Sequence, residues 1–428
     1  MLAPMPAHPS AAAAVHRPGT PRQGDDRCPG ALRLHQADDG YLARVRVPGG
    51  RLSARQTEAI GSAALELGDG AVHVTSRGNL QLRGLEARSG QALARRLHTA
   101  GLLPSAAHDR IRNVVASPLS GLDAAAVLDI EPLVAELDRV LCGSQALTAL
   151  SGRFLFALDD GRGDVLALDP DLAAVAESRD RMRLWVGARP TTRTCAPRDA
   201  ADLLAAAAHD FLRVARSCGA AAWRVADLGP DAGSIAPSAH GTLRPRAAPP
   251  APGLVRAGAQ VTGVHATFPL GKASGPAWAA LTSAAQMACP AQGSAPVRIT
   301  AWRGAVVVGA THPAATLRAL AGVGMLTDAG APLVGVTACT GLPGCGSSRS
   351  DVRAEAAALR LRTGIDHPLH VCGCERRCGS GTAARVEAVA TGPGRYAVRG
   401  YGVDGPGSTR TTIELPIVRS GRERSDER

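Results

Sequence analysis

The pattern of apolar and polar residues alternates between strand-like and helical spacing, and two separate stretches of the chain show this alternation in the same order. In the first stretch, alternation over Tyr41–Gly50 predicts a strand, and apolar residues at helical spacing over Ser53–Leu67 predict a helix. Alternation returns over Ala71–Gly84, and helical spacing returns over Ser89–Ala100. Residues two apart share one face of a strand, and residues three or four apart share one face of a helix. The stretch therefore predicts a sheet with helices packed on one face.

A second stretch repeats this order closely enough to predict an internal duplication. The strand-like Thr75-Ser76-Arg77 of the first stretch falls opposite Thr300-Ala301-Trp302 of the second. A duplicated fold commonly places its site between the two copies, so we expect the chemistry of this chain there. The strand-like and helical segments of the second stretch alternate and are Val264–Lys272, Pro276–Met287, Val297–Gly309 and Pro313–Ala321.

Breaks in these patterns predict the domain organisation. Residues 1–27 lack periodicity and predict a disordered leader, and the Pro-, Ala- and Arg-rich stretch 242–258 predicts a linker. One strand-and-helix unit lies on each side of the linker, and each unit is followed by a longer α/β segment. The expected boundaries are 28–105 and 106–241 for the first copy, 259–325 and 326–416 for the second, and 417–428 for a disordered tail.

Four cysteines near the C-terminus form the clearest chemical motif. Cys339 and Cys345 are spaced C-x5-C, and Cys374 and Cys378 are spaced C-x3-C after an intervening 28 residues. Glycines beside both pairs let the backbone turn tightly and aim amide N–H groups at sulfur. Four thiolates in two glycine-rich segments are a typical ligand set for a [4Fe–4S] cluster. We therefore predict that these four residues bind such a cluster.

A zinc site, a disulfide framework and unrelated thiols stay open as alternatives for these cysteines. A structural zinc site usually pairs cysteines at C-x2-C to C-x4-C spacing, which the first pair exceeds. A disulfide framework is less expected in a long chain whose ten cysteines include six outside the motif. Cys372 lies two residues before Cys374 and could replace it as a ligand.

Composition narrows the class of partner. The formal net charge is +11, and arginine carries almost all of the positive charge because Lys272 is the only lysine. Arginine binds carboxylates through paired hydrogen bonds, so a ligand with several carboxylates is favoured. Nucleic acid is disfavoured, because aromatic residues make up only 3% of the chain and no basic stripe alternates with stacking side chains.

The apolar runs of the chain are short. None approaches the length of a membrane span, and Ala11–Val15 is too brief for the core of a signal peptide. We therefore expect a cytoplasmic protein without a membrane contact, in a reducing compartment that suits an iron–sulfur site. No glycine-rich segment joins a strand to a helix as G-x-G-x-x-G, so no NAD or flavin domain is expected.

Taken together, these motifs resemble the sulfite/nitrite reductase hemoprotein family over residues 28–415. The two cysteine pairs match that family's cluster signature. Its strand motif corresponds to Thr75–Arg83, its Arg-Asn-Val motif to Arg112-Asn113-Val114, and its lysine-containing motif to Leu150–Leu155. The resemblance implies an α+β fold in which two ferredoxin-like half-domains and two larger α/β domains are related by pseudo-twofold symmetry.

The resemblance also implies roles for individual residues. In the reductases, arginines of these motifs bind the carboxylates of siroheme, and two lysines of the last motif face the anion on its iron. Here Arg153 and Leu155 replace those lysines, so part of the machinery for reducing an oxyanion is missing. Cys378 matches the position whose thiolate bridges the cluster and the siroheme iron. The implied tetrapyrrole-binding residues are Arg77, Asn79, Arg83, Arg112, Asn113 and Arg153.

Within the family, the sequence resembles the precorrin-3B synthases of cobalamin biosynthesis more closely. The segments Cys28–Gly30, Pro48–Ser53 and Thr75–Gly84 carry this likeness, together with Leu155. In that subgroup the tetrapyrrole is the substrate. The resemblance implies that precorrin-3A is hydroxylated at C20 by molecular oxygen, with closure of a γ-lactone. It also implies a [4Fe–4S] cluster and an additional non-heme iron. Because no NAD or flavin domain is expected in this chain, we expect a separate ferredoxin or NAD(P)H-dependent reductase as electron donor.

Two other functions stay open at this level. One is a siroheme- and [4Fe–4S]-dependent sulfite or nitrite reductase, in which siroheme is a bound cofactor. The other is a non-catalytic protein that binds zinc or an iron–sulfur cluster. In each case both halves of the expected cleft lie in one chain, so a monomer is sufficient and is expected.

Overall fold

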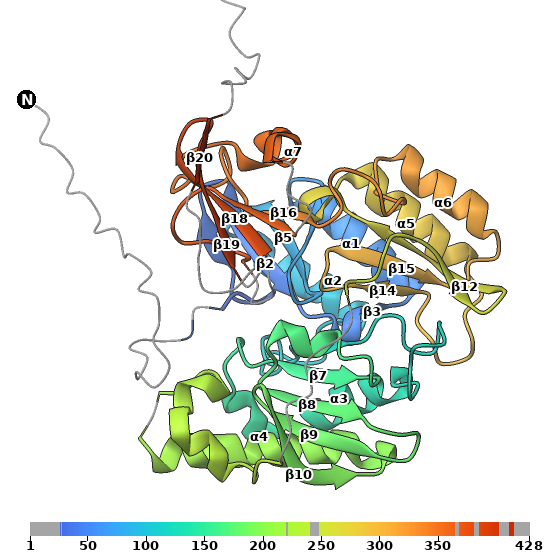
Figure 1. The fold of residues 1–428 in the computed structure, drawn as a ribbon, viewed down its shortest axis with the longest axis vertical. Helices are drawn as coiled ribbons and strands as arrows, with labels where there is room; N and C mark the ends of the chain where they lie inside the picture. Colours follow the sequence, from blue (N-terminus) through green and yellow to red (C-terminus); the bar gives the residue numbers. More distant parts are fainter. Residues whose placement is uncertain are drawn as a thin grey trace, which may run out of the picture.

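The computed structural model describes residues 26, 28–219, 221–239, 248–363, 368–380, 385–401 and 411–414. In this part of the chain, two antiparallel half-domains lie side by side, and two larger α/β domains pack against them from different directions (Figure 1). The expected duplicated α+β architecture is thus confirmed.

Each half-domain contains one five-stranded sheet with two helices on one face. The first sheet has the order β1-β2-β5-β4-β13, and the second has the corresponding order β11-β12-β15-β14-β3. The first half-domain contains η1 (Pro48–Gly50) and its helices are α1 (Ala54–Leu67) and α2 (Ser89–Thr99); the second contains η6 (Pro269–Gly271), α5 (Gly275–Met287) and α6 (Pro313–Gly322). The strands in chain order are β1 (His35–Ala37), β2 (Gly40–Val45), β3 (Arg51–Leu52), β4 (Val72–Val74), β5 (Leu80–Leu85), β11 (Gly253–Ala257), β12 (Gln260–Thr267), β13 (Lys272–Ala273), β14 (Val297–Ile299) and β15 (Gly304–Val308).

The two half-domains exchange their shortest strands. Strand β3, from the first copy, pairs with β14 of the second sheet, and β13, from the second copy, pairs with β4 of the first. Two-residue strands carry too little periodicity to be assigned from sequence. The exchange means that neither sheet is complete without the other copy, so the half-domains form one structural unit.

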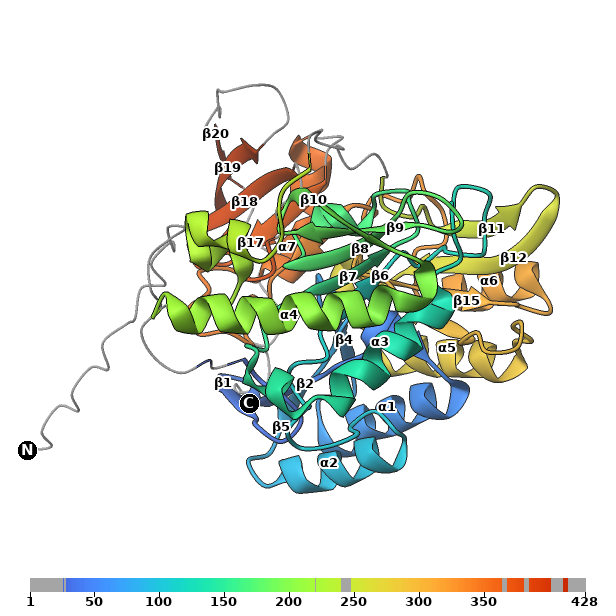
Figure 2. The same cartoon turned by 90° about the horizontal axis from the view of Figure 1, so that it is seen from below.

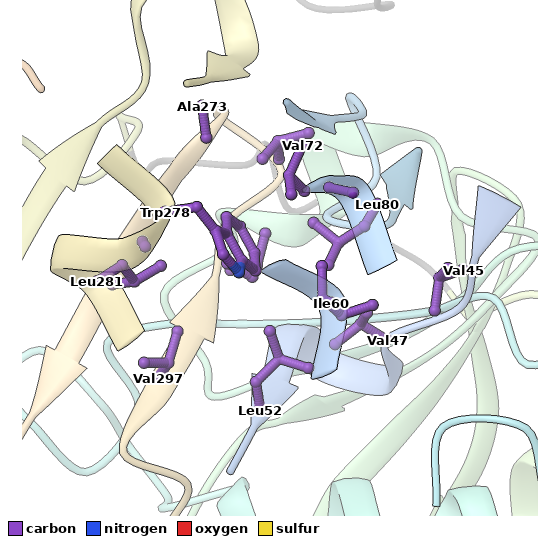
Figure 3. Packing of buried hydrophobic residues seen from close by; sticks show 14 of the residues in the cluster. Val45, Val47, Leu52, Ile60, Val72, Leu80, Ala273, Trp278, Leu281 and Val297 are labelled. Atoms are coloured by element: carbon purple, nitrogen blue, oxygen red, sulfur yellow. The ribbon is translucent and has the colours of Figure 1, made fainter. Parts of the chain in front are cut away.

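A single apolar core joins the two copies (Figure 3). The indole of Trp278, on α5, packs between the copies, and its Nε1 donates a hydrogen bond of 2.8 Å to the carbonyl oxygen of Thr57 on α1. A Cβ at Gly61 would lie 2.7 Å from the Trp278 ring, so only glycine allows the indole to approach α1 this closely. The core therefore fixes the orientation of one half-domain on the other.

The larger domains repeat one topology. In each, three parallel strands are followed by two antiparallel ones, in the orders β6-β7-β8-β9-β10 and β16-β17-β18-β19-β20. Figure 2 shows α4 running across the first of these sheets beside α3. The helices are α3 (Glu131–Gly143), η2 (Gln145–Ala149), η3 (Val165–Leu168), η4 (Pro197–Asp199), α4 (Ala200–Ser217), η5 (Val225–Ser234) and α7 (Val352–Thr363). The strands are β6 (Val114–Ala116), β7 (Phe156–Asp159), β8 (Leu172–Ala176), β9 (Met182–Val186), β10 (Arg189–Cys195), β16 (Val336–Ala338), β17 (Leu369–Cys372), β18 (Arg385–Gly392), β19 (Arg395–Tyr401) and β20 (Thr411–Glu414).

The four helices predicted in the half-domains all form, within one residue of the predicted bounds. Helix α1 begins at Ser53 because its hydroxyl accepts from the Gln56 N–H while the Gln56 side chain accepts from the Ser53 N–H. The linker prediction is wrong in its last part, because residues 253–257 form β11. The predicted tail and nearly all of the leader lie outside the described residues. Within the described residues, no helix is both long enough and apolar enough to cross a membrane.

Two carboxyl groups are buried after β7. Asp159 and Asp164 are 0% and 1% exposed, and one oxygen of each has no hydrogen-bond partner among the described residues. Burial raises the pKa of Asp159 to about 6 and that of Asp164 to about 7, and the proximity of the two carboxyls adds to the rise for Asp164. The unfolded chain releases both protons at lower pH, so the folded state is favoured in acid. This contribution to stability falls as pH rises above the ordinary carboxyl pKa of 3.8, and it is fully lost above about 7.

Replacing Asp164 with Asn is therefore expected to remove much of this pH dependence. The amide cannot ionise, and its N–H can donate toward Asp159. Three pKa units correspond to at most ~4 kcal/mol, and part of this is already lost at pH 5, so the stability of the variant relative to the parent should rise from pH 5 to pH 8. Urea midpoints at pH 5, 6.5 and 8 measure this, and parallel curves for the two proteins would contradict it.

Candidate functional site

A cleft of about 670 Å³ lies between the first half-domain and the domain that carries the cysteines. One wall is the face of the first sheet that the helices leave uncovered. The second half-domain contributes Gly271 and Arg303, and the loops after β16 and β17 close the opposite side. All four cysteines of the predicted cluster motif line this cleft. The duplication thus places the site between the copies, as expected.

Strand alternation explains which side chains of the first sheet reach the cleft. Val45, Leu80 and Leu82 are buried in the shared core, whereas Arg44 and Arg83 lie between such residues in sequence and line the cleft. Arg77 is not on a strand. It lies in the turn between β4 and β5, so the strand expected over Ala71–Gly84 is interrupted there, and both Arg77 and Arg83 line the cleft.

The cysteines come from two loops at the ends of parallel strands. Cys339 directly follows β16, Cys345 lies farther along the same loop, and Cys374 and Cys378 follow β17. The Gly373 N–H donates to Cys339 Sγ at 3.1 Å. Burial raises the pKa of the Cys378 thiol, and the nearby thiols of the other three cysteines raise it further. Four mutually repelling thiolates are stabilised by a bound cationic metal group, so this donor set fits a cluster.

The two loops that carry the cysteines pack closely against each other. A Cβ at Gly373 would lie 1.9 Å from Ser348 Oγ, so only glycine lets the loops approach. Within the described part of the chain, no three His, Cys, Asp or Glu side chains converge closely enough to bind one metal ion.

Cys372 differs from its neighbours. It is fully buried at the end of β17 and does not line the cleft, whereas Cys374 does. Burial raises the pKa of the Cys372 thiol strongly, which opposes the thiolate form that a metal requires. This placement favours Cys374 as the ligand.

The tip of the β1–β2 hairpin binds the Cys345 loop. Asp38 accepts a hydrogen bond of 2.7 Å from the Gly346 N–H. Asp39 forms a bidentate salt bridge with Arg83, whose guanidinium also donates to the Gly344 carbonyl oxygen. Arg83 thus lines the cleft, as predicted, but its charge is already neutralised and it holds a cysteine loop in place.

Other arginines of the cleft have no such partner. Among the described residues, no carboxylate lies within ion-pair distance of the guanidinium groups of the set Arg44, Arg46, Arg77, Arg303 and Arg353. Burial lowers the pKa of Arg46, Arg77 and Arg303 to about 10. Buried cations without counter-charges are costly, so this cleft is built to receive anionic groups. Of this set the sequence singled out only Arg77.

Arg112 and Asn113 do not line the cleft. Arg112 is buried in a bidentate salt bridge with Asp138 and also donates to the Leu102 carbonyl oxygen. Asn113 accepts from Arg46 and from Asn79, which itself reaches the cleft wall. The described contacts therefore give Arg112 a structural role instead of the predicted ligand contact, and give Asn79 and Asn113 the role of orienting Arg46.

The two positions at which the family has lysines lie in different surroundings. Arg153 lines the cleft, with its guanidinium 4.9 Å from the centre of the Trp223 ring. Its carbonyl oxygen accepts from Arg77. Leu155 is fully buried in a separate apolar cluster beside the sheet and does not line the cleft. The motif therefore presents one cation to the cleft and no second one.

The pseudo-symmetric counterpart of the cleft is filled. Ser117 follows β6 as Cys339 follows β16, and its Oγ accepts from the Asp160 N–H as the Cys339 sulfur accepts from Gly373. On that side, apolar residues close the space; these are Leu119, Leu122, Val255, Val306 and Val308. Ser117 of the first copy thus occupies the position at which the second copy has the thiol of Cys339.

Comparisons with known proteins agree with this architecture. Residues 34–100 match the nitrite/sulfite reductase ferredoxin-like half domain. The structure resembles that of the Mycobacterium tuberculosis NirA protein, with a TM-score of 0.63 and 20% identity over 87% of this chain and 78% of that one. Its fold is that of the nitrite/sulfite reductases. In this fold, the cleft described above lies between the two halves of the duplication.

Relatives within the nitrite/sulfite reductase group carry different names. The ferredoxin–nitrite reductase of Synechococcus elongatus is 32% identical over 187 residues, which are 41% of this chain and 36% of that protein. A precorrin-3B synthase of Sinorhizobium sp is 31% identical over 160 residues, 37% of this chain and 34% of that protein. The matches span about a third of each relative. Similarity alone therefore does not choose between the two activities.

Proposed function

We propose that this protein is an oxygen-dependent monooxygenase that converts precorrin-3A to precorrin-3B. The observation that carries the proposal is the cleft itself, where arginines without carboxylate partners among the described residues lie beside four cysteine thiols. Precorrin-3A is a tetrapyrrole with several acetate and propionate groups, so its charge pattern complements this cleft. The absence of a cation at Leu155 supports a tetrapyrrole substrate over a siroheme that holds an oxyanion.

The arginines would bind and orient the substrate. Arg77 and Arg303 approach the cleft from equivalent turns of the two copies, whereas Arg44 lies on β2 and Arg46 directly follows that strand. A free guanidinium can form paired hydrogen bonds with a carboxylate. The Arg46 nitrogens already donate to Arg110, Asn113, Cys28 and Gly152, so Arg46 contributes its charge and not a free pair of donors. Because these cations have already lost much of their hydration, a bound carboxylate restores favourable charge compensation. Contacts from both copies would fix the ring relative to the cysteines.

The four cysteines Cys339, Cys345, Cys374 and Cys378 would hold a [4Fe–4S] cluster, which supplies single electrons when bound. The Gly373 N–H donor to Cys339 would stabilise the thiolate charge in that state. In the proposed reaction, one atom of molecular oxygen enters the C20 hydroxyl and the other leaves as water, which consumes two electrons and two protons. We propose that a separate ferredoxin or NAD(P)H-dependent reductase delivers these electrons to a monomeric enzyme.

Incubation of the purified protein with precorrin-3A, a chemical reductant and ¹⁸O₂ tests this proposal. We expect a product heavier than the substrate by one labelled oxygen atom, formed only when protein, oxygen and reductant are all present. A control reaction with H₂¹⁸O and unlabelled oxygen should give a C20 hydroxyl without label. Unchanged precorrin-3A in the complete reaction, with a protein that retains its iron, would contradict the proposal.

A siroheme-dependent nitrite or sulfite reductase is the second candidate. The 32% identity to a ferredoxin–nitrite reductase favours it, and Arg153 retains one cation of the lysine motif at the cleft. Reduction of nitrite or sulfite by the purified protein with a strong chemical reductant would support this candidate. If the protein is instead the proposed monooxygenase, it should reduce neither nitrite nor sulfite, and the reductant should not be consumed.

A further inference from the structure

Two arginines are attached to the backbone of the cysteine loops. Arg353, near the start of α7, donates from Nε to the carbonyl oxygen of Cys339 at 3.2 Å. Arg303, from the turn between β14 and β15, donates to the carbonyl oxygen of Gly379, the residue after Cys378, at 3.4 Å. One cation thus lies beside each of the two cysteine pairs, and each is held by a different domain of the second copy.

Arg303 and Arg353 have no carboxylate partner at ion-pair distance among the described residues, whereas several carboxylates near them have a cationic partner. Arg303 is 8% exposed. Asp69 and Asp351 act on Arg353 from beyond ion-pair distance, and buried Glu355 accepts hydrogen bonds from Ser350 and Tyr396 outside the cleft lining. Three other negative groups near the same loops are compensated or exposed. Glu387 is paired with Arg385 and Arg377, and Asp39 with Arg83. Asp38 lies exposed to solvent, where its field is screened. Among the described residues that line the cleft beside the thiols, Asp38 is the only carboxylate, so positive charge predominates there.

We propose that Arg303 and Arg353 raise the reduction potential of the iron–sulfur cluster that the four cysteines hold. The inference rests on the cluster of the proposed function but not on the identity of the tetrapyrrole. Reduction adds one negative charge to a cluster, and nearby fixed cations stabilise that charge. Net charge and hydrogen bonding near the ligands are known controls of cluster potential. In a partly buried site the effect is stronger than in water, because the effective dielectric constant is lower.

The test is a redox titration of the purified, cluster-loaded protein without tetrapyrrole, followed by electron paramagnetic resonance. Arg353→Gln should lower the potential, so that the ratio of reduced to oxidised cluster at a fixed potential falls about tenfold, or 59 mV for one electron. Arg353→Lys should stay near the parent because it retains the charge. Arg303→Asn should act in the same direction as Arg353→Gln, since asparagine accepts the left-handed backbone at this position, where φ is +64°.

Arg349 provides a matched control, because it lies in the same loop region but is exposed. Arg349→Gln should leave the potential unchanged, since solvent screens an exposed charge. Equal potentials for the parent, Arg353→Gln and Arg303→Asn at full iron content would overturn the proposal. An equal shift in Arg349→Gln would also overturn it, because the effect would then be that of general surface charge. Absence of iron and sulfide from the parent would instead refute the cluster, which separates the two failures.

Discussion

Replacing Cys339 with serine is expected to abolish cluster binding and with it all turnover. Cys339 is the most constrained of the four thiols, because its sulfur accepts the Gly373 N–H and its carbonyl oxygen accepts from Arg353. A serine hydroxyl does not ionise at neutral pH and is a poor ligand for iron. Iron and acid-labile sulfide should fall from about four of each per chain to near zero. Broad visible absorption should be lost with them.

Cys372→Ser is the matched control, because Cys372 is a cysteine of the same segment that does not line the cleft. This variant should retain full iron content, whereas Cys374→Ser should lose it. The reverse result, with iron retained by Cys374→Ser and lost by Cys372→Ser, would show that Cys372 is the ligand. Retention of iron in Cys339→Ser would contradict the proposed ligand set.

Replacing Arg77 with Gln is expected to weaken tetrapyrrole binding by at least ~30-fold. Removing one partner of a buried, hydrogen-bonded charge pair typically costs about 2–5 kcal/mol. Arg77 fits this case, because burial lowers its pKa to about 10 and its only described hydrogen bond from the guanidinium is to the Arg153 carbonyl oxygen. Anaerobic absorbance titration with precorrin-3A measures the affinity while oxygen-dependent turnover is prevented.

Arg112→Gln is the control that separates an effect on substrate binding from an effect on protein stability. Arg112 is likewise an arginine of one of the family motifs, but it is fully buried and its partner is Asp138. Its loss should lower the melting temperature and leave the affinity for precorrin-3A within about twofold of the parent, since additivity holds for sites without shared partners. An affinity loss in Arg112→Gln as large as in Arg77→Gln would contradict the assignment of these two roles.

Sequence patterns were sufficient for the helices of the half-domains and for the duplication. Helix α1 combines helical periodicity with a capping box at Ser53, so local and global signals agree. The exchange of β3 and β13 was not predictable, because a strand of two residues has no period. Strand β11 was hidden in a stretch whose proline content resembles that of a linker, although its pairing with β12 orders it.

The site was predictable where a motif carried several residues of one chemistry. The spacing of the four cysteines identified the loops that line the cleft. The roles of single arginines were harder to predict. An arginine in a motif has the same sequence signal whether its guanidinium binds a ligand or a carboxylate of the protein. Arg112 was predicted to bind the ligand because its partner Asp138 lies on α3, 26 residues farther along the chain, and only the fold brings the two together. The alternation of Arg44 and Arg46 with valines could have indicated a charged sheet face, but Arg303 and Arg353 became visible only from the fold.

The visible spectrum of protein purified without air and then desalted tests the central claim most directly. The claim is that the tetrapyrrole of this cleft is a substrate beside an iron–sulfur cluster and not a bound prosthetic group. The account predicts a broad iron–sulfur absorption without a Soret band, and about four irons and four sulfides per chain. A siroheme Soret band that survives desalting, in stoichiometric amount with the chain, would contradict it.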